Sequence, residues 1–120
     1  MAKYSHLPIW KTGMSLAVHL ENAIRRFPRY HKYTLGSDLR HKALTICTLV
    51  ARANSAHGVK RFQTLEELVY SVEEIKTLVQ LAREVQAWAN QNEFLQATEY
   101  VVDIGKQAAS WHRSSGSGAG

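Results

Sequence analysis

The sequence has 120 residues, of which 45% are hydrophobic and 21% charged, with a single cysteine. That length suits one domain with its own core, while one cysteine excludes a disulfide framework and indicates a reducing cytoplasm. No segment approaches the roughly 18 apolar residues of a membrane span, and the N-terminus lacks the apolar stretch of a signal peptide.

The net charge of +5 is unevenly distributed along the chain. Residues 1–63 hold eleven Lys or Arg and two acids, a net charge of +9. The remainder holds four basic and eight acidic residues, a net charge of −4. Such asymmetry indicates one face for nucleic acid or for an acidic protein. The alternative is an ordinary solvated basic face.

A first helix is predicted over residues 8–27, where apolar residues recur at steps of three and four. Pro8 fits the first turn because its missing N–H would be unpaired there anyway. Pro28 ends the helix, since the residue before a proline is pushed out of the α region. Residues 29–36 are then expected to form a basic loop.

A second helix is predicted over residues 37–57, again from apolar steps of three and four. Asp38 lies favourably near its positive N-terminal end. Gly58 marks the end of this helix, and residues 59–63 are expected to form a second basic loop.

Two more helices follow. Thr64 and Glu67 have the spacing of a capping box, which predicts a boundary there and a helix over residues 65–90. Asn92 is the expected cap of a fourth helix over residues 93–113.

No segment alternates with the two-residue period of a half-buried strand, so no sheet is expected. Four helices of about 20 residues joined by short connections predict an all-α fold, an antiparallel up-down-up-down four-helix bundle over residues 1–113. Residues 114–120 read as a flexible Gly/Ser tail.

Basic side chains around the first loop are the candidate binding residues, because Lys and Arg contact phosphates with salt-dependent, largely sequence-independent affinity. Tyr30 and Tyr33 lie among them, where their rings could stack on unpaired bases or pack over the end of the bundle. The basic candidates are Arg25, Arg26, Arg29, Lys32, Arg40 and Lys42, joined by Lys60 and Arg61 from the second basic loop.

No catalytic, metal or cofactor site is predicted. The sequence contains no HExxH, paired CxxC, P-loop, GxGxxG or nucleophile elbow. Cys47 falls in an apolar helical region and is expected to be a small buried hydrophobe. Trp10, Trp88 and Trp111 fall in apolar rows, which favours core packing or subunit contact over base stacking. We therefore expect a protein that is not an enzyme.

The order and spacing of several short motifs resemble those of the accessory variability determinant (Avd) proteins of diversity-generating retroelements. These motifs are Leu7-Pro8-Ile9-Trp10-Lys11, Phe27-Pro28-Arg29, Lys32-Tyr33-Thr34-Leu35-Gly36 and Ser110-Trp111. The related four-helix-bundle family from intervening sequences of 23S ribosomal RNA genes shares the pattern of residues 35–40. That family usually has an Asn-Ile-Ala-Glu-Gly-like sequence where this chain has residues 51–55, which favours the retroelement branch.

The resemblance implies a small basic bundle that assembles into a homopentamer. It implies binding to the element's reverse transcriptase and template RNA, with cDNA as a further nucleic-acid partner, in support of mutagenic cDNA synthesis and retrohoming. The sequence assigns no individual cation to the polymerase or to the RNA, and one subunit or a ring of them could make the surface. The alternative function is a structural four-helix-bundle interaction module that binds an acidic protein without nucleic acid.

Overall fold

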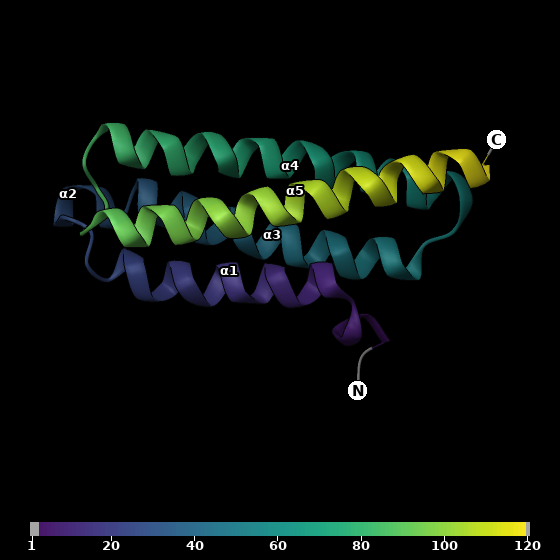
Figure 1. Cartoon of the computed structure of the whole chain (residues 1–120), viewed down its shortest axis with the longest axis horizontal. Coiled ribbons are helices and arrows are strands. Elements are labelled where there is room, and N and C mark those ends of the chain that lie inside the picture. Colours follow the sequence, from purple (N-terminus) through teal and green to yellow (C-terminus); the bar gives the residue numbers. More distant parts are fainter. Residues whose placement is uncertain (1–2, 120) are drawn as a thin grey trace.

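Four long helices carry the fold (Figure 1). In the computed structural model, which describes residues 3–119, they are α1 (Pro8–Ile24), α3 (Leu35–Ser55), α4 (Gly58–Glu84) and α5 (Gln91–Ala119). A 3-10 helix, η1 (Lys3–His6), and a one-turn helix, α2 (Arg29–Lys32), accompany them. The described residues contain no strand, so the predicted all-α fold is confirmed. None of the described helices combines the length and the apolar character needed to cross a membrane.

Each long helix packs against two others. α3 lies against α1 and α4, and α5 lies against α4 and α1. The molecule measures 47 × 29 × 21 Å. Figure 1 shows α2 and the α4–α5 connection at one end, and the α3–α4 connection at the other end with the C-terminal part of α5. This placement decides which charged residues become neighbours.

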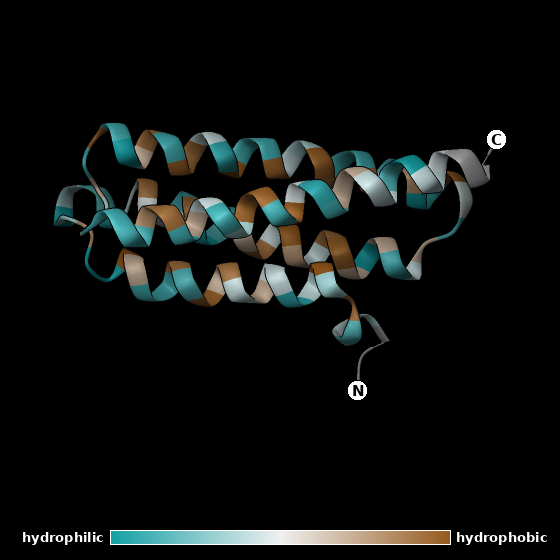
Figure 2. Ribbon diagram, viewed as in Figure 1, coloured by the Kyte–Doolittle hydropathy of each residue, from teal (hydrophilic) through white to brown (hydrophobic). Residues whose placement is uncertain are grey.

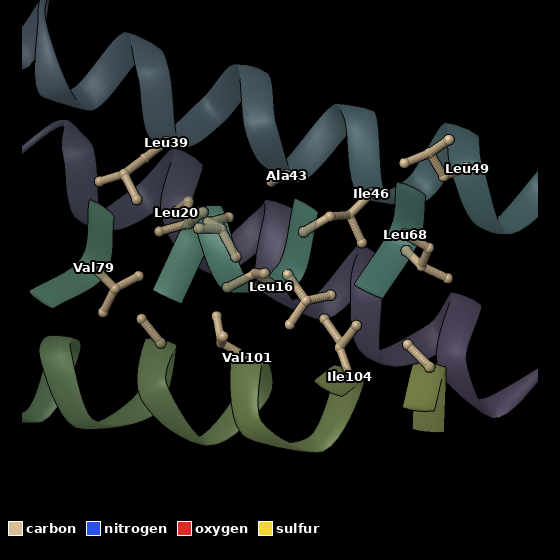
Figure 3. Packing of buried hydrophobic residues seen from close by; sticks show 14 of the residues in the cluster. Leu16, Leu20, Leu39, Ala43, Ile46, Leu49, Leu68, Val79, Val101 and Ile104 are labelled. Atoms are coloured by element: carbon tan, nitrogen blue, oxygen red, sulfur yellow. The ribbon is translucent and has the colours of Figure 1, made fainter. Parts of the chain in front are cut away.

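The core is made by the apolar rows that the sequence predicts. Apolar bands recur along every long helix, whereas α2 is mostly hydrophilic (Figure 2). Each Leu, Ile or Val that becomes fully buried stabilises the fold by about 1.5–3 kcal/mol. Figure 3 shows core side chains from all four helices converging, among them Leu16, Leu20, Leu39, Ile46, Leu68, Val79, Val101 and Ile104, all of which are buried.

Some apolar residues of α1 and of the C-terminal end of α4 stay at the surface. Met14, Leu81 and Val85 are 41%, 47% and 39% exposed. Trp10 and Trp88 are half-buried and pack against the core, as predicted for the tryptophans. The apolar side chains left at the surface are therefore available for contacts outside the subunit.

The chain after α1 differs from the predicted loop. Helix α1 ends at Ile24 rather than residue 27, and a tighter turn follows in which the Arg26 N–H donates to the Ala23 carbonyl at 3.0 Å. Residues 29–32 form α2, whose last N–H, of Lys32, donates to the Pro28 carbonyl at 3.0 Å. Pro28 can begin this turn because its fixed φ suits a helix start and only its carbonyl is needed.

The predicted capping box is wrong. Helix α4 begins at Gly58, so Thr64 lies inside the helix, where its hydroxyl donates to the Lys60 carbonyl at 2.8 Å. Inside a helix a Thr hydroxyl can also bond the carbonyl four residues back, so the local pattern fits both positions. Residues 59–63 are consequently helical rather than a second basic loop. Gly58 has φ of +56°, a conformation that favours glycine, and it starts α4 after α3 has ended at Ser55.

Helix α4 ends at Glu84, six residues before the predicted position. Gln86 adopts a left-handed φ of 61°, and its N–H donates to the Arg83 carbonyl at 3.0 Å. The N–H of the buried Ala87 donates to the Ala82 carbonyl at 2.8 Å. These two bonds make a Schellman motif, which needs a left-handed residue but not necessarily glycine.

Helix α5 begins two residues earlier and ends later than predicted. The Asn90 side-chain oxygen accepts a hydrogen bond from the Glu93 N–H at 2.9 Å, so Asn90 rather than Asn92 caps the helix. Where the sequence predicts a tail after residue 113, α5 continues through Ala119. Residues 1, 2 and 120, which belong to the predicted bundle and tail, lie outside the described residues.

Candidate nucleic-acid interface

Close packing fixes the position of α2 at the end of the bundle. Gly36 is buried, and a Cβ there would lie 2.7 Å from Cγ2 of Ile24 and 3.3 Å from the His31 carbonyl oxygen. Because glycine lacks this atom, the starts of α3 and α2 approach the end of α1 closely. The Thr34 hydroxyl donates to the Tyr30 carbonyl at 3.2 Å and closes the turn after α2.

Two tyrosines stand out from this end. Tyr30 is 83% exposed and Tyr33 is 71% exposed. The Tyr30 ring meets His31 edge-on at 5.0 Å, so neither tyrosine packs over the end of the bundle as one of the two predicted alternatives had it. Burying a large exposed aromatic ring against a partner lowers the free energy, so such rings are typical of binding surfaces.

Three cations of the same segment of the chain have no acidic partner among the described residues. Arg25 and Arg29 are exposed, and Lys32 is half-buried. Their charges are therefore not neutralised within the subunit. We call Arg25, Arg29, Lys32, Tyr30 and Tyr33 the basic end surface.

Arg26, the neighbour of Arg25, has a different position. Its Nε donates to Glu93 Oε1 at 2.6 Å, and Nη2 contacts the same oxygen. Glu93 is only 9% exposed, and its carbonyl is 2.8 Å from His19 Nε2. Arg26 therefore joins the end of α1 to the start of α5 rather than facing solvent unpaired.

Arg40 and Lys42 on α3 also pair with acids. Arg40 Nε donates to Glu21 Oε1 at 2.7 Å, and Lys42 Nζ donates to Glu74 Oε1 at 3.0 Å. The first pair joins α3 to α1 and the second joins α3 to α4. The structure thus brings six predicted cations to one half of the molecule but leaves three of them paired.

Lys60 and Arg61 lie in the first turn of α4, at the opposite end from α2 (Figure 1). Arg61 Nε donates to the Ala53 carbonyl at 2.9 Å, and Nη2 donates to the Asn54 carbonyl at 3.0 Å. Arg61 thereby adds a side-chain donor to the last carbonyls of α3, of which that of Ala53 also accepts from the Ala56 N–H at 3.3 Å. Lys60 is exposed. Neither residue joins the basic end surface.

The α4–α5 connection is a part of this end that sequence reasoning missed. The Trp88 ring meets the Phe27 ring edge-on at 5.2 Å, which places the connection beside the end of α1. It was missed because the predicted helix ran to residue 90. The Asn90 cap, three residues before Glu93, is the signal that could have shown the break.

Two apolar surfaces lie elsewhere on the molecule. A groove of about 500 Å³ runs between α1 and α3, with Trp10, Met14 and Leu44 in its lining. On α5, a shallower depression of about 690 Å³ includes Leu95 and Val102, which are 49% and 41% exposed. These surfaces are on different helices, so they are not equivalent.

Two further observations concern the metal-binding and nucleophilic groups of the chain. Across the described part of the chain, no group of three His, Cys, Asp or Glu side chains is placed to hold a metal ion. Burial raises the pKa of the Cys47 thiol, which disfavours the reactive thiolate. Comparison of the sequence with protein-family models and with curated proteins gives no match.

Proposed function

We propose that the chain is a non-catalytic accessory subunit of a diversity-generating retroelement that binds template RNA and the element's reverse transcriptase. The observation that carries the proposal is the basic end surface, where exposed Tyr30 and Tyr33 lie among cations without acidic partners. Cations bind phosphates and aromatic rings stack on unpaired bases, so the combination suits RNA.

The proposed role divides the work between two proteins. This subunit supplies sequence-independent electrostatic affinity through Arg25, Arg29 and Lys32, and the polymerase supplies the chemistry. Holding the template, and the cDNA as it forms, near the polymerase would support mutagenic cDNA synthesis and retrohoming in the cytoplasm. The motifs that resemble Avd proteins support this assignment.

We infer that the four helices form the antiparallel up-down-up-down bundle. Ion pairs support this topology, because Lys42 near the start of α3 pairs with Glu74 in α4, and Arg52 near the end of α3 pairs with Glu67. The hydrogen bond from Thr12 to Asp103 likewise joins the start of α1 to the middle of α5, whereas Arg26, after the end of α1, pairs with Glu93 at the start of α5.

We also propose that copies of the chain associate into a homopentamer. The two apolar surfaces support head-to-tail contact, since non-equivalent patches that meet between copies generate rings when the rotation closes. Light scattering should give five times the 13.6 kDa chain mass, and a monomeric mass would contradict the ring.

Co-expression with the retroelement's reverse transcriptase tests the function. A tagged polymerase should retain this chain and template RNA in a pull-down, and cDNA synthesis should fall when the chain is omitted. If omission changes neither the complex nor the cDNA yield, the proposed function is wrong. Retention of an acidic protein with no nucleic-acid binding would instead identify the interaction module.

A further inference from the structure

A small pocket lies where α4 ends and α5 begins. Its volume is about 280 Å³, and it is lined by Arg83, Gln86, Trp88, Asn90, Gln91 and Phe94. Sites for drug-sized ligands have roughly 300–1,000 Å³. The size therefore suits a single flat heterocycle rather than a larger ligand.

Flat groups form part of the lining. The Arg83 guanidinium carbon lies 5.1 Å from the centre of the Phe94 ring, and the Trp88 ring centre lies 6.3 Å from it. Trp88 is held in place because its Nε1–H donates to the Val79 carbonyl at 3.2 Å. A guanidinium plane and an indole both offer a stacking surface to a heterocycle.

Three side-chain amides complete the lining. Each amide carries both donors and acceptors, the combination that the edges of nucleobases present. The Asn90 oxygen is used in capping α5, which leaves its NH2 group to donate. The side-chain amides of Gln86 and Gln91 form no hydrogen bond to another described residue, so they are available to a ligand.

The backbone conformation of Gln86 also supports a binding role for its side chain. Its φ of 61° is costly for a residue with a Cβ, and glycine would adopt it with less strain. Residues held in such conformations cluster at functional sites. What Gln86 has and glycine lacks is the amide side chain in the pocket lining.

The α4–α5 connection that carries the pocket lies at the same end of the molecule as α2 and the basic end surface (Figure 1). The contact between Trp88 and Phe27 and the ion pair between Arg26 and Glu93 join the α4–α5 connection to the end of α1. Arg25 and Arg29 flank Phe27 in the sequence. A strand whose phosphates contact these cations therefore passes close to the pocket.

We infer that this pocket binds one unpaired base of a single-stranded RNA or DNA whose phosphates lie on the basic end surface. The inference rests on the proposed nucleic-acid function and adds that the pocket binds a base of the nucleic acid. An acidic peptide would use the cations but leave the amides and the flat groups without partners.

Fluorescence anisotropy with labelled strands tests the pocket on the full chain. A base-bearing single strand should bind about tenfold more tightly than an abasic strand of the same length and charge, since stacking is lost without the base. Arg83→Lys keeps the charge but removes the flat guanidinium, so it should reduce that ratio without changing the salt dependence. Gln86→Ala and Gln91→Ala should reduce it as well.

Matched exchanges away from the pocket are the controls: Arg52→Lys and Gln63→Ala should leave the ratio unchanged. Equal affinity for base-bearing and abasic strands would overturn the pocket while leaving the proposed function intact. Binding of neither strand would overturn both, as would tighter binding of polyglutamate than of any strand.

Discussion

At Gly36, the missing side chain sets the geometry of the basic end. A Cβ at this position would meet Cγ2 of the buried Ile24 at 2.7 Å and a backbone oxygen of α2 at 3.3 Å. Forcing an atom into such a site costs about 1–3 kcal/mol. We expect Gly36→Ala to lower the free energy of unfolding, measured by urea titration, and to weaken RNA binding because α2 must move.

Gly105 provides the matched control in the middle of α5. A Cβ there would lie 3.4 Å from Cγ1 of Val72, an ordinary van der Waals contact. Gly105→Ala should therefore stabilise the protein by about 0.5–1 kcal/mol through reduced backbone entropy of the unfolded chain. If both substitutions were stabilising, close packing at Gly36 would not be what positions α2.

Arg61 and Lys60 are neighbours with different expected roles. Arg61→Ala removes two hydrogen bonds to the last carbonyls of α3 and should cost about 1–2 kcal/mol of stability. Lys60→Ala should change stability by less than about 0.5 kcal/mol, since Lys60 is exposed. Thermal melts measure both. An equal loss for the two variants would contradict the capping role of Arg61.

Cys47 gives the fold a dependence on alkaline pH. Burial raises the pKa of its thiol above the value in the unfolded chain. The contribution of the neutral thiol to stability is therefore complete below the unfolded pKa and is lost as pH rises through the folded pKa. Urea titrations from neutral to strongly alkaline pH should show the stability of wild type falling toward that of Cys47→Ala. A constant difference across this range would mean that the folded thiol is not desolvated.

At the scale of the helices, the end of α4 is held by a left-handed residue other than glycine. Gln86→Gly should stabilise the protein by about 1 kcal/mol, because glycine adopts φ of 61° without a Cβ clash. Gln63→Gly, in the exposed interior of the same helix, should destabilise it by about 1 kcal/mol. Urea titration compares the two, and destabilisation by both would contradict the Schellman ending.

The Gln86→Gly variant separates the effect on stability from the effect on base binding. If the amide is used in the base pocket, Gln86→Gly should be more stable than wild type and yet discriminate less between base-bearing and abasic strands. A variant that gained stability and kept full discrimination would show that the side chain is not needed.

Helix interiors were predictable from the sequence because burial follows a period of three and four residues. In α3, the apolar residues at these steps are all buried: Leu39, Ala43, Ile46, Val50 and Ala53. Helix ends were less predictable because they depend on contacts between distant segments. Thr64 has the pattern of a cap but lies inside α4, and the start of α5 depends on Asn90, two residues before the predicted cap.

The sequence predicted that the candidate site is basic, but it did not predict which basic residues remain unpaired there. The cluster of cations around Pro28 was evident from charge alone. Which of them remain unpaired depends on acids far along the chain, because Glu93 forms an ion pair with Arg26 and Glu74 forms one with Lys42. The pocket at the α4–α5 connection was missed because its residues come together only when α4 ends at Glu84.

For the whole molecule, the central claim is that unpaired charge at one end of the bundle binds nucleic acid. The net charge of +5 would give some affinity wherever the cations lay, so the claim concerns their position. Ion pairs already neutralise Arg26, Arg40 and Lys42 within the subunit. The salt dependence should therefore come mainly from Arg25, Arg29 and Lys32.

The most direct test is the salt dependence of single-stranded RNA binding by two triple variants of equal net charge. Arg25→Gln/Arg29→Gln/Lys32→Gln should weaken binding and reduce the slope of log K against log salt by about 2, at roughly 0.7 per phosphate contact. Lys11→Gln/Arg52→Gln/Lys60→Gln should bind with nearly the wild-type slope. Equal effects of the two variants, or an unchanged slope in the first, would contradict the basic end surface as the binding site.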